Sequence, residues 1–281
     1  MLIRAAASSV NGADIDVRAG HLRAISGRRF PKGAGFDFTG EVAAVADDVA
    51  DFRVGEGVWG FVNNLKATPT ATGAEYVLAP ARAIFRRPNG LDAVEAAALP
   101  GAAGAALATL QKIGVLAGER VLIRGGAGGV GSAAVQLAAA TGAQVVALAR
   151  GVHLDRIREL GALQAYDYTT TDPKELGEFD VIVDPVGKDL HAYRGLLRRG
   201  GRPPIARGRR RLRQARDSRF LTLCAVEPNW STRRVGTERS KHCSCMAGRT
   251  VVGADVVQHH VQGCFDRAGV AVELGQEQSA L

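Results

Sequence analysis

Hydrophobic and polar positions follow two different patterns along the chain, and the change falls near residue 95. Before it, short apolar runs are separated by turn-forming residues, as in Gly40–Ala46, Phe52–Val62 and Ala74–Ala79. Such runs are typical of β-strands in a small, irregular, barrel-like module. We expect its aromatic residues to form most of its core: Phe36, Phe38, Trp59, Phe61 and Tyr76.

From Leu91 onward, helical periodicity alternates with short apolar runs. Helices are predicted at 92–99, 102–113, 132–141, 154–160 and 189–197, and strands at 121–123, 145–149, 164–168 and 179–184. Strands that alternate with helices predict an α/β fold, a doubly wound parallel sheet of the Rossmann type.

The glycine-rich stretch between the first two of these strands satisfies G-x-G-x-x-G. Gly126 permits the tight turn, Gly128 lets the backbone approach a pyrophosphate, and Gly131 lets helix and strand pack closely. The next residues form an apolar helical stripe that ends at Gly142, a helix C′ position. The order strand, glycines, helix, strand predicts a dinucleotide site, whereas the alternative is a glycine-rich turn without a ligand. The candidate cofactor-binding residues are Gly126, Ala127, Gly128, Gly129, Val130 and Gly131.

The end of the second strand indicates which dinucleotide is bound. An NAD site usually carries an acidic residue there that bonds the ribose 2′-hydroxyl. Here the strand ends in Arg150, and no acidic residue follows before Asp155. Arginine pairs well with a phosphate, so we expect NADPH as cofactor. The alternative is a solvated arginine at a strand end.

The net charge of +8 is confined to one segment. Residues 198–219 contain ten arginines and one acidic residue, so their local charge of +9 exceeds that of the whole chain. The run Arg207–Arg213 has no aromatic residue within it, which favours a solvated arm over a nucleic-acid site. No apolar run approaches 18 residues and the start is too short for a signal peptide, so we expect a cytoplasmic protein without membrane spans.

All four cysteines lie in the last quarter of the chain. The first 223 residues therefore hold neither a cysteine-ligated zinc site nor a disulfide framework, and we expect no metal. One alternative is a zinc site in the tail, although its residues form no C-x-x-C pair: His242, Cys243, Cys245, His259, His260 and Cys264.

Eight motifs in order make the chain resemble the zinc-independent, zeta-crystallin-like quinone oxidoreductase branch of the medium-chain dehydrogenase/reductase superfamily. These are residues 7–14, 35–41, 52–60, 96–101, 118–123, 126–131, 160–162 and 184–187. The resemblance implies a GroES-like domain with the substrate pocket and a Rossmann domain with NADPH. It also implies hydride transfer to a quinone or an α,β-unsaturated carbonyl, and a homodimer.

Site residues are carried over from this resemblance position by position. Asn11 matches the polar pocket residue near the nicotinamide and is our candidate catalytic residue. Tyr168 matches a residue that helps hold the adenosine phosphate, and Asp184 and Val186 lie in the loop beside the nicotinamide. The alternatives are an Asx-turn for Asn11 and a solvated hydroxyl for Tyr168.

The chain also departs from the family pattern. Members of that family usually begin earlier, with strands of the GroES-like domain that we do not find in this sequence, and His153 replaces the lysine that contacts the 2′-phosphate. Ala105 replaces a threonine, and Pro203 and Pro204 stand where a central strand is expected. Phe220–Pro228 is typical of a strand. From Trp230 to Cys245 the sequence shows neither the helical nor the strand periodicity of apolar residues.

These features predict three segments: a partial GroES-like domain (1–95), a Rossmann domain (96–219) and a divergent tail (220–281). Besides the NADPH-dependent reductase, two functions stay open. One is an inactive or nucleotide-binding relic of the family. The other is a nucleic-acid binder with a basic arm.

Overall fold

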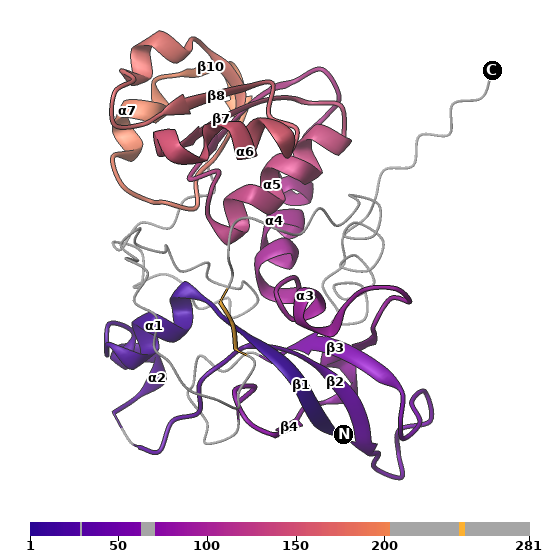
Figure 1. The fold of residues 1–281 in the computed structure, drawn as a ribbon. Coiled ribbons are helices and arrows are strands. Elements are labelled where there is room, and N and C mark those ends of the chain that lie inside the picture. Colours follow the sequence, from indigo (N-terminus) through magenta and orange to yellow (C-terminus); the bar gives the residue numbers. More distant parts are fainter. Residues whose placement is uncertain (29, 63–70, 203–241, 245–281) are drawn as a thin grey trace, which may run out of the picture.

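The computed structural model describes residues 1–28, 30–62, 71–202 and 242–244. These residues build two sheets, an antiparallel one at the bottom of Figure 1 and a parallel one at the top. Helices α3 (Ala93–Ala97) and α4 (Pro100–Ile113) lie between the sheets in this view. The predicted architecture, an α/β fold with a parallel sheet joined to a β-rich module, is confirmed.

The antiparallel sheet has the order β11-β1-β2-β3-β5, and β4 also pairs with β1. Its strands are β1 (Leu2–Val10), β2 (Asp37–Ala44), β3 (Gly57–Phe61), β4 (Tyr76–Leu78), β5 (Ile84–Arg86) and β11 (His242–Ser244). Two short helices, α1 (Gly12–Arg18) and α2 (Arg23–Ser26), follow β1, and a 3-10 turn, Ala81–Ala83, precedes β5.

The core of this sheet explains its aromatic residues. Phe38, Val58 and Ile3 are fully buried in one apolar cluster. Phe36 is also buried and stacks on Phe61, with 5.8 Å between the ring centroids. Tyr76 was expected in the core, but it is 52% exposed because the residues of β4 alternate between buried and exposed, and only Val77 points inward.

The parallel sheet has the order β10-β9-β6-β7-β8. Its strands are β6 (Arg120–Arg124), β7 (Gln144–Ala149), β8 (Gln164–Asp167), β9 (Phe179–Val183) and β10 (Leu197–Arg202). Along the chain this is the order 3-2-1-4-5 that begins the dinucleotide-binding fold. The connections carry α5 (Gly129–Ala140), α6 (Leu154–Glu159) and α7 (Leu190–Arg194), with 3-10 turns at Gly151–His153 and Pro173–Leu176.

One apolar cluster joins β3 to the parallel-sheet domain. Trp59 of β3, 1% exposed, belongs to one apolar cluster with residues of α3, α4 and the parallel sheet, among them Ala96, Leu107 and Val121. Helix α3 begins cleanly because the Asp92 side chain accepts from the backbone N–H groups of its first turn. The two sheets are therefore packed through these helices.

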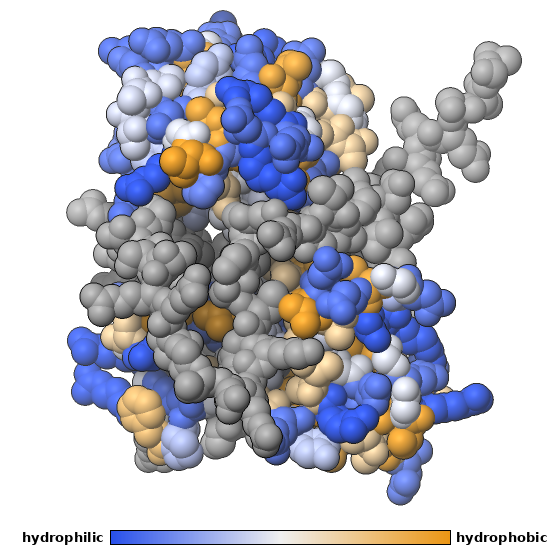
Figure 2. Space-filling model, in the orientation of Figure 1, coloured by the Kyte–Doolittle hydropathy of each residue, from blue (hydrophilic) through white to orange (hydrophobic). Residues whose placement is uncertain are grey.

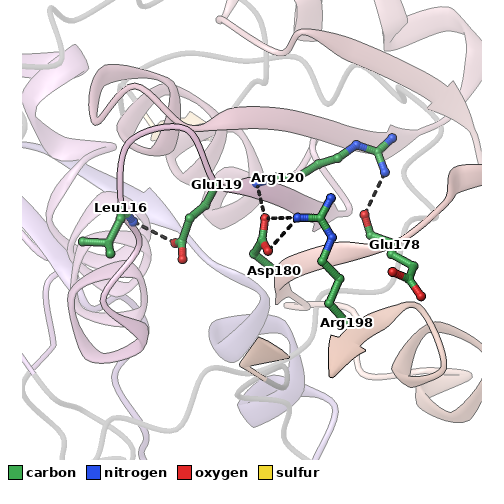
Figure 3. A network of polar contacts seen from close by, with 6 residues as sticks. All are labelled: Leu116, Glu119, Arg120, Glu178, Asp180 and Arg198. Carbon is green, nitrogen blue, oxygen red and sulfur yellow. Dashed lines mark hydrogen bonds and ion pairs between the residues drawn. The ribbon is translucent and has the colours of Figure 1, made fainter. Parts of the chain in front are cut away.

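A polar network holds the amino ends of the parallel strands (Figure 3). The Arg120 N–H donates to Asp180 Oδ2 at 2.8 Å, and Arg198 Nη1 donates to both Asp180 oxygens at 2.8 and 3.0 Å. Arg120 Nη1 reaches the Glu178 carbonyl at 2.9 Å, and the Leu116 N–H donates to Glu119 Oε2 at 2.8 Å. These contacts lie at the opposite ends of the strands from the glycine-rich turn, so they are structural.

Four strands differ from the sequence predictions. β1 and β5 were not predicted, and β10 forms up to Arg202, directly before the prolines that were expected to prevent a central strand. β11 lies within the stretch expected to have no strand, and it pairs in parallel with Ser8–Val10. The predicted strand at 220–228, the arginine run and most of the proposed tail zinc ligands lie outside the described residues.

On the face shown in Figure 2, hydrophilic residues cover most of the parallel-sheet domain, and hydrophobic ones form small separate patches. Within the described ranges, no helix combines the length and the hydropathy needed to cross a bilayer.

Candidate functional site

The switch point of the parallel sheet lies between β6 and β9, the neighbouring strands from which the chain order runs in opposite directions. Open α/β sheets bind ligands at such a point, outside the carboxyl ends of the strands. The glycine-rich turn follows β6, and residues 184–188 follow β9. These two segments touch, since a Cβ on Gly125 would lie 2.9 Å from Val186 Cγ2.

The glycine-rich turn has the shape of a phosphate-binding loop. The Gly128 N–H donates to the Gly125 carbonyl at 2.9 Å, which closes the turn, and α5 begins at Gly129. A Cβ on Gly131 would lie 2.0 Å from the Gly125 oxygen, so glycine is required there. The first N–H groups of a helix have no partner within it and carry partial positive charge. Gly129, Val130 and Gly131 form the first turn of α5 and supply these N–H groups.

The carboxyl ends of β7 and β8 bring Arg150 and Tyr168 to the same edge. Ala149 pairs with Asp167 across the strands, and the Tyr168 N–H donates to the Ala149 carbonyl at 3.1 Å. Arg150 is exposed and Tyr168 is 41% exposed.

Sequence reasoning missed Asp167 at this edge. Its Oδ2 accepts the Gly151 N–H at 2.8 Å, and its Oδ1 accepts the Thr169 N–H at 2.9 Å and the Thr169 hydroxyl at 2.7 Å. The Thr169 bonds foremost, then the Gly151 bond and the charge of Arg150, lower the pKa of Asp167. This carboxylate fixes the turn in which Arg150 lies.

Asp184 is buried, and both of its carboxylate oxygens accept hydrogen bonds from neighbouring residues. Its Oδ2 accepts from Arg124 Nη1 at 2.5 Å, and its Oδ1 accepts the N–H groups of Val186 and Gly187 at 2.9 and 3.0 Å. Arg124 also donates to the Lys188 carbonyl, and its guanidinium lies 3.9 Å from the centre of the Tyr193 ring. Asp184 therefore shapes the loop, and it would act on a cofactor through the loop backbone. Arg124 was not singled out from the sequence.

Asn11 lies in the other domain, at the junction of β1 and α1, within a polar cluster. Its Nδ2 donates to Asp37 Oδ2 at 2.7 Å and to Ser9 Oγ at 3.1 Å, while its backbone N–H donates to Asp14 Oδ2 at 2.8 Å. Ser9 Oγ donates to the same Asp37 oxygen at 2.5 Å, and Asp14 Oδ1 accepts the Gly35 N–H at 2.6 Å.

Burial raises the pKa values of both carboxylates beside Asn11, Asp37 and Asp14. Burial raises the pKa of Asp37 to about 6, although hydrogen bonds from Ser9 and Asn11 oppose the rise. The charge of Asp14 adds to it. Burial also raises the pKa of Asp14, against hydrogen bonds from Asn11 and Gly35. A carboxylate at position 37 was not predicted, although its motif, residues 35–41, was noted.

The comparisons with known proteins fit this geometry. Residues 1–89 match the alcohol dehydrogenase GroES-like domain family, and residues 129–205 match the zinc-binding dehydrogenase family. Within the described ranges, however, no group of three or more His, Cys, Asp or Glu side chains could hold a metal ion. The described residues therefore do not fit the zinc in the second family's name.

Individual relatives point the same way. A 2-methylene-furan-3-one reductase of Solanum lycopersicum is 33% identical over 214 residues, which are 74% of this chain and 55% of that protein. The quinone oxidoreductase of Coxiella burnetii is 33% identical with a TM-score of 0.67, over 72% of this chain and 64% of that one. The quinone oxidoreductase of Thermus thermophilus, solved also with NADPH, is 31% identical with a TM-score of 0.58 over 71% and 62%.

The chain spans about half the length of the curated relatives it matches. Two matched families in the expected order, a shared fold and about one-third identity agree with the motifs found in the sequence. The chain belongs to the medium-chain dehydrogenase/reductase superfamily, in its quinone oxidoreductase and alkenal reductase branch.

Proposed function

We propose that the protein is an NADPH-dependent oxidoreductase that reduces a quinone or an α,β-unsaturated carbonyl without a metal. The observation that carries this proposal is the meeting of the glycine-rich turn and the 184–188 loop at the switch point of the sheet. Relatives named as quinone oxidoreductases and a furanone reductase, one of them solved with NADPH, support it.

Each part of the cofactor has a matching group in the chain. The N–H groups of residues 126–131 would hold the pyrophosphate at the start of α5. Arg150 would pair with the 2′-phosphate, with Tyr168 beside it on the next strand. The Asp184–Gly187 loop would lie along the nicotinamide, with Val186 packed against the glycine turn.

When bound, the reduced nicotinamide supplies a hydride from its C4. The chain's own contribution is to position the two reactants and to surround them with fixed polar groups, of which Asn11 is the candidate nearest the chemistry. The proton that completes the reduction would come from solvent. No described side chain is assigned an acid–base role.

Arg150→Gln tests the cofactor assignment. Because a hydrogen bond to a charged group contributes about 1.5–3 kcal/mol, the variant should bind NADPH roughly ten- to a hundredfold more weakly and NADH unchanged. Fluorescence titration of both cofactors measures this, with the exposed Arg82→Gln as a matched control. Equal affinities of the wild type for NADPH and NADH would contradict the pairing of Arg150 with the 2′-phosphate.

Turnover tests the activity itself. Oxidation of NADPH in the presence of a quinone or an enone, followed by the absorbance of the reduced nicotinamide, should rise above background. NADPH binding without turnover would favour a nucleotide-binding relic. A cytoplasmic location, a homodimer and the absence of nucleic-acid binding stay predictions.

A further inference from the structure

The carboxyl ends of β7 and β8 lie next to the glycine-rich turn. The Gly126 N–H donates to the Leu148 carbonyl of β7 at 2.9 Å, and Arg150 directly follows that strand. The last pair of the ladder between β7 and β8 joins Ala149 to Asp167. The structure therefore places Arg150 and Asp167 at the edge where a dinucleotide-binding sheet recognises the 2′ substituent of the adenosine ribose.

The Asp167 side chain connects two turns at this edge. Its backbone carbonyl accepts the N–H groups of Thr170 and Thr171 at 3.2 and 3.0 Å, which closes the turn after β8. Its Oδ1 accepts the N–H and the hydroxyl of Thr169, and its Oδ2 accepts the Gly151 N–H at 2.8 Å, in the turn after β7. A Cβ on Gly151 would lie 2.7 Å from Oδ2, so glycine is required for this approach.

These contacts limit what Asp167 can do toward a cofactor. An ionised carboxylate has about four acceptor positions, and three of those of Asp167 are taken by the protein. An acidic residue that selects NAD must accept a hydrogen bond from the ribose 2′-hydroxyl. Asp167 has little capacity for that role, whereas Arg150, the residue before Gly151, is exposed and positively charged.

We propose that Asp167 is a positioning residue for cofactor selection, which fixes the turn carrying Arg150 so that the guanidinium is already placed for a 2′-phosphate. A group held in its bound position loses less conformational freedom when the ligand arrives. The gain is realised only with a ligand that carries the 2′-phosphate. This inference rests on the proposed function and adds Asp167 and Gly151 to its cofactor site.

The charge of Asp167 acts against its position. The Thr169 bonds foremost, then the Gly151 bond and the charge of Arg150, lower the pKa of Asp167, so it is ionised at neutral pH. If only this charge mattered, Asp167→Asn would remove a repulsion and bind a 2′-phosphate more tightly. Positioning predicts the opposite change, because an amide has a single acceptor oxygen and cannot hold both turns.

NMR titration of Asp167→Asn with adenosine 2′,5′-bisphosphate and adenosine 5′-monophosphate measures the sign of the change. The two probes differ only in the 2′-phosphate, and neither carries a nicotinamide. The variant should bind the bisphosphate at least about fivefold more weakly and the monophosphate within about twofold of the wild type. Unchanged or tighter binding of the bisphosphate would overturn the proposal, and so would an equal loss for both probes, which indicates a general structural defect.

Two further variants disturb the geometry and keep both charges. Gly151→Ala places a methyl group 2.7 Å from Asp167 Oδ2, whereas its control Gly195→Ala has open space and a φ of −67°. Thr169→Val removes a donor to Oδ1, whereas its control Thr170→Val removes only a 3.5 Å bond to the Asp167 carbonyl. The preference for the bisphosphate should fall at least about threefold in Gly151→Ala and Thr169→Val, and less than about twofold in the controls. Controls that lose as much would refute the role of these contacts.

A double variant tests whether Asp167 acts through Arg150. Arg150→Gln with Asp167→Asn should bind the bisphosphate no more weakly than Arg150→Gln alone, and losses that multiply would contradict the proposal. Hydrogen exchange in the cofactor-free protein tests the anchor itself, since the Gly151 N–H should exchange slowly in the wild type and rapidly in Asp167→Ala. Rapid exchange in the wild type would refute it. If the anchor and the phosphate preference are both found but no quinone or enone is reduced, this inference stands and the proposed reaction fails.

Discussion

At the scale of single residues, Asp37 is the most informative side chain. It is fully buried, and it forms no ion pair with any residue that the structure describes. Burying a carboxylate in this way favours its neutral form, because the charged form loses its hydration. Its protonation should therefore be visible in the stability of the whole fold.

The stability of the wild type should depend on pH through Asp37. The folded pKa of about 6 lies above the usual value of 3.8, so the folded state binds this proton more tightly than the unfolded state. The contribution is complete below pH 3.8 and is lost as the pH rises through 6, a cost of about 3 kcal/mol. Asp37→Asn lacks this titration.

Urea unfolding of both proteins from pH 3.8 to neutral pH, a range that includes the folded pKa of about 6, measures the effect. The stability of Asp37→Asn relative to the wild type should increase across this range, by up to the same amount. A difference that does not change with pH would mean that Asp37 titrates as an ordinary surface carboxylate does.

Site residues that belong to a local motif could be predicted from the sequence. Hydrogen-bond partners that come from distant parts of the chain could not. Gly126, Gly128, Gly131 and Arg150 follow from their places relative to strands. Asp37 escaped notice because it stands between Phe36 and Phe38, where an alternating strand would point it away from the core. All three residues are buried, since β2 is covered on both faces. An acidic residue between two aromatic residues in an apolar run was the sequence signal that could have indicated a buried carboxylate.

At the scale of elements, the glycine turn and α5 act as one unit. Gly131→Ala would place a methyl group 2.0 Å from the Gly125 oxygen, so the helix would have to separate from β6. We expect a loss of about 2–4 kcal/mol in unfolding free energy and no measurable NADPH binding. The control is Gly195→Ala, where φ is −67° and nothing lies within 4 Å, so a change of at most about 1 kcal/mol is expected.

The loop after β9 depends on the buried Arg124–Asp184 pair. Arg124→Met would leave Asp184 charged and unpaired, which costs about 3–5 kcal/mol for a buried pair. The matching change in an exposed pair, Arg4→Met beside Glu41, should cost at most about 1 kcal/mol. Chemical denaturation compares the two. Similar small losses would show that the loop does not rely on the pair.

The predictability of elements followed the strength of their local pattern. The helix α5 was predicted from its apolar stripe and from Gly142 as the residue after its end. In the structure α5 ends at Ala140, and Gly142 has a φ of +81°. The strand β1 was missed because its centre, Ala5–Ser9, consists of small residues with little strand preference. It forms because β2 pairs along it, a tertiary effect that no local window contains.

At the scale of the whole molecule, Trp59 couples the two sheets. Wild-type protein should unfold in one calorimetric transition, because this side chain belongs to the same apolar cluster as the parallel-sheet core. Trp59→Ala should cost about 3–5 kcal/mol and split the transition in two. Phe52→Ala, a buried aromatic in the antiparallel cluster alone, should lower stability without splitting it. A single transition in Trp59→Ala would place the coupling elsewhere.

The pairing of strand β11 has a consequence for the antiparallel sheet when it is separated from the rest of the chain. It pairs with Ser8–Val10, so residues more than 230 positions apart share one ladder, and β1 is covered along that half by a distant part of the chain. A fragment made of residues 1–95 would leave the backbone groups of Ser8–Val10 on that side without β11, ready to recruit a strand from another molecule. Such a fragment should self-associate, and a synthetic peptide spanning His242–Ser244 should suppress it.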